Sequence, residues 1–148
     1  MSTLISLRLP DDQTVQIEQL AHQTGRTVSE IVAQVLEEGL RTRAYPSIEF
    51  RDSPAGRQAY VSGTSLAVWE VVLVTSTFKE WERVERTAQH LRWPAARVQA
   101  ALRYAAAFPD EIEAALQDNA SYDFARLERE LPGVRRVIVP RADNPAPP

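Results

Sequence analysis

The sequence contains no cysteine and only two histidines among its 148 residues. The absence of cysteine excludes disulfide bonds and thiolate metal sites. The two histidines, His22 and His90, lie in different segments of the chain. No local pair of histidines is therefore present to bind a metal ion, and we expect the protein to use neither a metal nor a cofactor.

Motifs for catalysis and for membrane insertion are missing as well. Gly56 and Gly63 stand alone, so they form no glycine-rich phosphate-binding loop. The hydroxyl side chains that flank Gly63 have no nearby base that could activate one of them as a nucleophile. No apolar run approaches the ~20 residues of a membrane-spanning helix, and residues 1–3 begin no signal peptide. The sequence therefore predicts a cytoplasmic protein that is not an enzyme.

The charged residues are nearly balanced and leave a net charge of −3. Residues 1–45 carry four arginines against six carboxylates. Because DNA phosphates attract local cations, any DNA binding has to come from the arrangement of a few arginines rather than from bulk charge. We expect such binding to be modest and sensitive to salt.

The first segment is predicted to form one strand followed by two helices. In residues 3–9 the alternation places three apolar side chains on one face of a strand: Ile5, Leu7 and Leu9. The other face carries Leu4, Ser6 and Arg8. Pro10 ends the strand and opens a helix that stops at Gly25.

The second helix begins with a capping box formed by Thr27 and Glu30. Apolar residues then recur at helical spacing as far as Leu40. One strand and two short helices cannot close a core, and an unpaired strand favours pairing with another copy. The pattern predicts a two-fold homodimer in which the N-terminal strands pair.

Residues 2–43 resemble the ribbon-helix-helix family of CopG-, Arc- and MetJ-type repressors and antitoxins. The resemblance rests on Leu-Arg-Leu-Pro-Asp-Asp at 7–12, on the Thr-Gly-Arg-Thr-Val-Ser-Glu stretch at 24–30 and on Leu-Glu-Glu-Gly-Leu at 36–40. It implies a dimeric ribbon in the DNA major groove, with base contacts from Leu4, Ser6 and Arg8. It implies phosphate contacts from Arg26, Thr27 and Ser29. The alternative is a module that only dimerises.

The central segment follows a short polar connector at residues 41–46. It is predicted to contain a hairpin with strands at 47–50 and 58–61, because turn residues separate two alternating runs. Residues 67–74 fit either a strand or a buried helix. Helices at 78–90 and from Trp93 to about Phe108 have the outline of a helix-turn-helix. We expect Trp69, Trp81 and Trp93 to anchor the core.

Residues 47–118 resemble the winged-helix family of VapB-type antitoxins, which accompany PIN-like toxins. The motifs are Gly-Thr-Ser-Leu-Ala-Val-Trp-Glu at 63–70 and Ala-Ala-Leu-Arg-Tyr at 100–104. If the second helix of this unit enters a major groove, Ala95 and Ala96 face outward together with the candidate DNA contacts Arg97, Ala100 and Arg103. Solvated surface arginines are the alternative.

The C-terminal segment combines a helix at 110–117, a further helical pattern from Ser121 and a strong strand former at 134–139. The proline-rich tail at 140–148 is expected to be disordered. A strand before a loose tail can add to a sheet edge on a partner, or it can pair within its own dimer. The toxin-contact candidates are Leu127, Leu131, Val134, Arg135, Arg136, Val137 and Val139.

These patterns predict a mainly α-helical chain with short β elements. Residues 1–44 are expected to form the ribbon-helix-helix module, 45–120 the winged-helix-like domain and 121–148 the toxin-binding segment. The predicted function is that of a homodimeric, operator-binding repressor and type II antitoxin that neutralises a PIN-like ribonuclease. The alternatives are an interaction adaptor that uses the first module only to dimerise, and a stand-alone transcription regulator of the CopG family.

Overall fold

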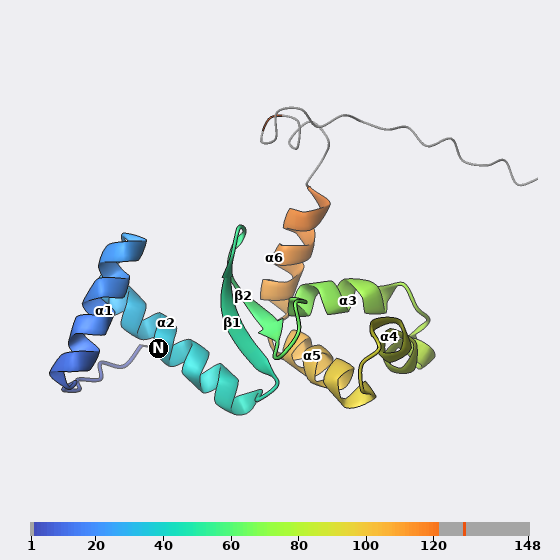
Figure 1. Cartoon of the computed structure of the whole chain (residues 1–148), viewed down its shortest axis with the longest axis horizontal. Coiled ribbons are helices and arrows are strands. Elements are labelled where there is room, and N and C mark those ends of the chain that lie inside the picture. Colours follow the sequence, from blue (N-terminus) through green and yellow to red (C-terminus); the bar gives the residue numbers. More distant parts are fainter. Residues whose placement is uncertain (1, 122–128, 130–148) are drawn as a thin grey trace, which may run out of the picture. The chain divides into compact units, whose positions relative to one another are not determined.

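A computed structural model of the protein describes residues 2–121 and residue 129. The chain divides into two units, Met1–Ala107 and Phe108–Pro148. The described part is mainly helical, with one two-stranded antiparallel sheet (Figure 1). The predicted fold class, mainly α with short β elements, is confirmed at that level. The candidate toxin contacts between Leu127 and Val139 lie outside the described residues.

Two helices open the first unit. α1 (Asp11–Thr24) carries Asp11 and Asp12 in its first turn, where the helix dipole favours negative charge. Gly25 ends it at a φ of 65°, a left-handed conformation that glycine adopts without strain. α2 (Val28–Ala44) begins with the predicted capping box between Thr27 and Glu30. These local predictions are confirmed.

α2 continues further than the sequence indicated, so most of the predicted connector at 41–46 is helical. In its last turn Arg41 pairs with Glu37 and donates a hydrogen bond to the hydroxyl of Tyr104 at 2.9 Å. The backbone N–H of Tyr45 bonds to the carbonyl of Arg41 at 2.8 Å. Contacts with a distant residue therefore favour an additional helical turn, and Pro46 follows it.

Residues 2–10 form neither a helix nor a strand in the single chain, although residues 3–9 were predicted to be a strand. A strand is held by hydrogen bonds to a neighbouring strand. The sheet of the described residues pairs β1 with β2 and does not include this segment. The alternating pattern thus has no pairing partner within the described chain.

The predicted hairpin is confirmed, with longer strands. β1 (Ile48–Ser53) and β2 (Gly56–Val61) pair from Ile48↔Val61 to Ser53↔Gly56. The turn residue Gly56 has a φ of 102°, which an L-amino acid rarely adopts. Within the first unit the hairpin lies between α2 on one side and α3 and α5 on the other (Figure 1).

The ambiguous run at 67–74 belongs to a helix, α3 (Val68–Ser76). Glu70 caps it by accepting the N–H of Ala67 at 2.8 Å. The helix predicted at 78–90 is shorter: a 3₁₀ turn, η1 (Glu80–Glu82), precedes α4 (Arg83–Leu91). At the end of α3 the hydroxyls of Thr75 and Thr77 donate to carbonyls of that helix at 2.7 Å.

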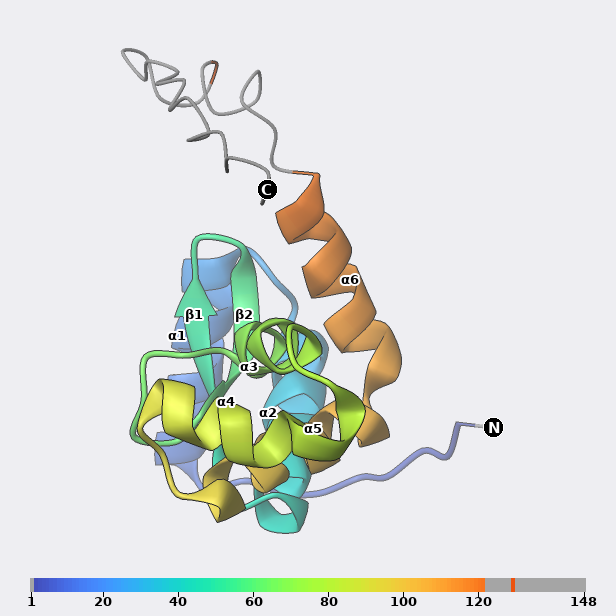
Figure 2. The ribbon, with the colours of Figure 1, turned by 90° about the vertical axis from the view of Figure 1, so that its right-hand side faces the viewer.

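The core of the first unit lies between the hairpin and the cluster of α3, α4 and α5 (Ala95–Ala107) (Figure 2). Tyr104 of α5 is fully buried, and its ring packs edge-on against Tyr45 and Phe50 at centroid distances of 5.5 and 6.4 Å. The other large, fully buried side chains are Ile48, Val61, Val68, Val71, Val98 and Thr87.

The prediction that three tryptophans anchor this core is wrong for Trp81. Trp69 and Trp93 are half-buried, whereas 77% of Trp81 is exposed. Trp81 lies in η1, and the break between α3 and α4 moves it off the face that a continuous helix would have buried.

The second unit begins with α6 (Pro109–Ala120), with Pro109 at its first position and Asp110 and Glu111 in its first turn.

Candidate nucleic-acid interface

The N-terminal residues that the sequence assigned to base contacts are accessible. Leu4 is 92% exposed, and Ser6 and Arg8 are exposed beside it. The opposite side of the same segment is exposed as well, with Ile5 at 75% and Leu7 at 59%. Leu9 is half-buried, and the single chain leaves the other side chains of both faces exposed.

The helices beside this segment also leave apolar side chains in solvent. Within residues 2–44 the buried hydrophobic residues are Ala21 and Ile31. Six larger apolar residues are between 43% and 60% exposed: Val15, Leu20, Val28, Val35, Leu36 and Leu40. We call this set, with Ile5 and Leu7, the open apolar surface. A soluble chain rarely exposes so many large apolar residues in one segment unless they meet a partner.

The beginning of α2 is held by its own side chains. Thr27 accepts the N–H of Glu30 at 3.2 Å, and Glu30 accepts the N–H of Thr27 at 2.8 Å. The backbone hydrogen bond from Thr27 lowers the pKa of Glu30. Ser29 is exposed, whereas Arg26 donates to the side-chain oxygen of Gln34. The side chain of Arg26 therefore extends along α2 toward Gln34. The structure does not bring the three predicted phosphate contacts together around one point.

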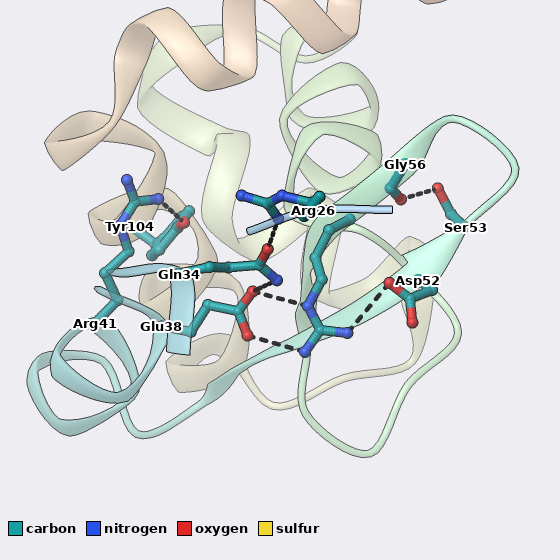
Figure 3. A network of polar contacts seen from close by, with 9 residues as sticks. Arg26, Gln34, Glu38, Arg41, Asp52, Ser53, Gly56 and Tyr104 are labelled. Atoms are coloured by element: carbon teal, nitrogen blue, oxygen red, sulfur yellow. Dashed lines mark hydrogen bonds and ion pairs between the residues drawn. The ribbon is translucent and has the colours of Figure 1, made fainter. Parts of the chain in front are cut away.

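Arg26 is the first member of a polar network that connects α2 with the hairpin (Figure 3). Gln34 donates to Glu38 at 3.0 Å. Glu38 accepts two hydrogen bonds from Arg57 of β2, at 2.7 and 2.8 Å. The remaining nitrogen of the Arg57 guanidinium lies 3.3 Å from Asp52. This fork joins the N-terminal helices to the hairpin.

The ion pair shifts the pKa of both partners. Burial raises the pKa of Glu38, but hydrogen bonds from Arg57 and Gln34 lower it by more, so the net direction is downward. The hydrogen bond with Glu38 raises the pKa of Arg57 further above its ordinary value. Sequence reasoning missed this pair, because its members are 19 residues apart and no local pattern connects them.

The three candidate DNA contacts on α5 differ in their exposure and in their neighbours. The guanidinium of Arg97 lies over the ring of Trp93 at 5.7 Å. Ala100 is 7% exposed, so the prediction that it faces outward is wrong. Ala100 lies beside residues 44–47, and together with them and Arg103 it lines a small depression of ≈ 170 Å³. Arg103 is exposed, as predicted.

Two further depressions run along α5. One, of ≈ 450 Å³, is lined by Ala96, Gln99, Leu102, Arg103 and Ala106. The other, of ≈ 390 Å³, lies at the beginning of the helix and is lined by Pro46, Ser47, Ser62, Pro94, Ala96 and Arg97. Both are open surfaces rather than enclosed cavities. Sequence reasoning missed Gln99, although its position four residues before Arg103 placed it on the same helix face.

Within residues 2–121 and residue 129, no group of three or more histidine, aspartate or glutamate side chains is arranged to hold a metal ion. In the same residues, no helix combines the length and the apolar character needed to cross a membrane. Comparison of the chain with protein-family models, with curated proteins and with solved structures finds no match.

Proposed function

We propose that the protein is a dimeric, operator-binding repressor and the antitoxin of a type II toxin–antitoxin pair, acting against a PIN-like ribonuclease. The observation that carries the dimeric repressor is the open apolar surface beside an alternating, unpaired N-terminal segment. The antitoxin role rests on the resemblance of residues 47–118 to VapB-type antitoxins.

In a dimer, two copies of the chain would cover each other's open apolar surface. Two segments at 3–9 would pair antiparallel and satisfy each other's backbone hydrogen bonds. Ile5 and Leu7 would then turn toward the helices and cover the apolar residues of α1 and α2. Burying a leucine or valine side chain contributes about 1.5–3 kcal/mol, so several such residues per copy favour a stable dimer.

The outward face of the paired ribbon would present Leu4, Ser6 and Arg8. A two-stranded ribbon fits the major groove of B-DNA, and an arginine can bind guanine there through two hydrogen bonds. The capped beginning of α2 would face the phosphates with its backbone N–H groups. With one cation per strand and a net negative chain, we expect a modest affinity that decreases as the salt concentration rises.

The toxin would be held by the C-terminal segment. Arg135 and Arg136 are the residues we propose to reach the acidic metal site of a PIN-like ribonuclease, because arginine pairs with carboxylates through two hydrogen bonds. The test is co-expression with the neighbouring reading frame, followed by a pull-down on the full chain and on Arg135→Ala/Arg136→Ala. Equal recovery by both proteins would count against this contact.

An adaptor that dimerises without binding DNA is the second candidate. Leu4 on the outward face and the excess of carboxylates in residues 1–45 favour it. A titration of the full chain into its own upstream DNA, at low and moderate salt, distinguishes the two functions when a scrambled duplex is measured beside it. Preferential, salt-sensitive binding supports the repressor, and binding to neither duplex supports the adaptor.

Substituting one arginine sharpens this test. Arg8→Ala should lower operator affinity by about 5- to 160-fold, since a bidentate arginine–guanine contact contributes about 1–3 kcal/mol. Arg43→Ala is the matched control, because it removes the same charge from the end of α2. Both variants should remain dimeric in sedimentation. An equal, small loss in both would leave Arg8 without a reading role.

A further inference from the structure

The outer face of α5 is a row of small and polar side chains. The helix buries Val98, Ala101 and Tyr104 against the rest of the first unit. On the opposite side it exposes four residues spaced three and four apart: Ala96, Gln99, Arg103 and Ala106. At 100° per residue Gln99 lies at the centre of this outer face, with Arg103 one turn further along.

Gln99 and Arg103 are free to meet a ligand. In the described part of the chain neither has a hydrogen bond, an ion pair or a ring contact. Arg97, by contrast, lies over Trp93, and Ala100 is buried. The residues on α5 that can reach outward are thus a glutamine and an arginine flanked by two alanines.

The charged side chains along the outer face of α5 are positive. The described residues that line the three depressions along α5 include Arg97 and Arg103 and no carboxylate. This is a local exception in a chain with 20 acidic and 17 basic residues. A polyanion such as DNA matches the charge of such a surface.

The arrangement of α4, a turn and α5 is compatible with α5 entering a groove of DNA. α4 and α5 are joined by a tight turn in which Arg92 has a φ of 57°. In helix-turn-helix proteins the second helix of such a pair lies in the major groove, while the first crosses the backbone. Alanines at 96 and 106 let the helix approach closely, and a thymine methyl group can pack against them.

We propose that α5 is a second sequence-reading element for double-stranded DNA, in which Gln99 binds adenine and Arg103 binds guanine in the major groove. The amide of glutamine matches N6 and N7 of adenine, and the guanidinium of arginine matches O6 and N7 of guanine. This inference rests on the proposed function, since it requires that the protein bind DNA. The ribbon and α5 together would read a longer operator than the ribbon alone.

The experiment is an enrichment of bound duplexes from a randomised pool, with the full chain and its variants. Gln99→Ala should lose the preference for adenine at one position of each half-site. It should also bind the best wild-type sequence about 5- to 160-fold more weakly. Gln117→Ala is the matched control, since Gln117 is an exposed glutamine on α6, outside the α4–α5 pair. Its enrichment should equal that of the wild type.

Arg103 distinguishes a base contact from a phosphate contact. Arg103→Lys keeps the charge but loses the two-pronged guanine contact. We expect it to lose the preference for guanine at one position and to retain the salt dependence of the wild type. An unchanged sequence preference in this variant would overturn the assignment of Arg103 to a base.

The outcomes separate this inference from the proposed function. If the wild-type protein enriches no sequence, both fail. If it enriches an operator and only Arg8→Ala alters the preference, the repressor stands and the reading role of α5 is overturned. If the α5 variants keep the full preference but fail to capture the toxin, the face belongs to a protein partner. Unchanged thermal unfolding midpoints would show that exposed Gln99 and Arg103 were replaced without loss of fold.

Discussion

Residues 11–44 and residues 45–107 are both built from short amphipathic elements, but they bury their apolar residues very differently. The first region exposes Val15, Val35, Leu36 and Leu40 to between 50% and 60%. The second encloses Tyr104 and a set of valines completely. The difference indicates that the central region closes its core within one chain, whereas the N-terminal region leaves apolar residues in solvent that the proposed dimer would cover.

The number and kind of elements explain this contrast. The hairpin, α3 and α4 pack against α5, whose alanines allow close packing. In the N-terminal region α1 and α2 pack against each other, and the segment before them is unpaired. The two regions are joined by the Glu38–Arg57 ion pair and by the hydrogen bond from Arg41 to Tyr104. A change in one region should therefore affect the other weakly.

The largest effect should come from the centre of the closed core. Tyr104→Ala is expected to lower the free energy of unfolding by about 3–5 kcal/mol, because it leaves a cavity between α5, Tyr45 and Phe50. Chemical denaturation monitored by circular dichroism measures it. Tyr104→Phe keeps the ring contacts and removes only the hydroxyl that accepts from Arg41, so it should cost clearly less. Equal losses would place the stabilisation in the hydroxyl rather than in packing.

A smaller effect on folding, but a large effect on assembly, is expected from Leu36→Glu. A carboxylate on the open apolar surface would have to be buried in the dimer, and we expect the dimer dissociation constant to rise by about 100-fold or more. Sedimentation velocity over a concentration series measures it. Leu73→Glu is the control, since Leu73 is 42% exposed on α3 of the closed region. If both variants dimerise like the wild type, the open surface is not the interface.

The sequence predicted features that depend on neighbours within a few residues. The left-handed Gly25, the Thr27–Glu30 capping box and the hairpin are of this kind. It did not predict the long-range contacts of Arg41 with Tyr104 or of Arg57 with Glu38, because no local pattern encodes them. Residues 3–9 show the reverse case: their alternation is typical of a strand, but a strand is formed only with a second strand. The spacing from Arg103 placed Gln99 on the same helix face, but the exposure of that face depends on how the core orients α5.

The link between the two regions should respond to pH. The folded-state pKa of Glu38 is lowered from its ordinary value of 4.5, mainly by its hydrogen bonds with Arg57. A lowered pKa contributes stability that is present above 4.5 and is lost as the pH falls through the folded-state value. Glu38→Gln should remove this part of the pH dependence, at a cost of about 1 kcal/mol near pH 7. Denaturation curves between pH 3 and pH 7, roughly the range in which carboxylates titrate, measure it.

Glu18→Gln is the matched control for this change, because Glu18 is an exposed carboxylate of α1 with no ion pair or hydrogen bond from its side chain among the described residues. Its variant should keep the pH dependence of the wild type between pH 3 and pH 7. A flattened profile in both variants would mean that general charge, rather than the fork between Glu38 and Arg57, gives the pH response.

The smallest effect should come from Trp81, which at 77% exposure is more exposed than Leu73, the other large apolar residue in solvent among residues 45–107. Trp81→Ala is expected to change the free energy of unfolding by less than about 0.5 kcal/mol, as is usual for exposed sites. Trp69→Ala should cost more, since Trp69 is half-buried and donates to Gln58 at 3.4 Å. Both are measured by denaturation at two protein concentrations. If Trp81→Ala destabilises strongly, and more so at high concentration, Trp81 is buried between copies. The central region would then depend on a partner, as we propose for the N-terminal region, and the contrast between the two would fail.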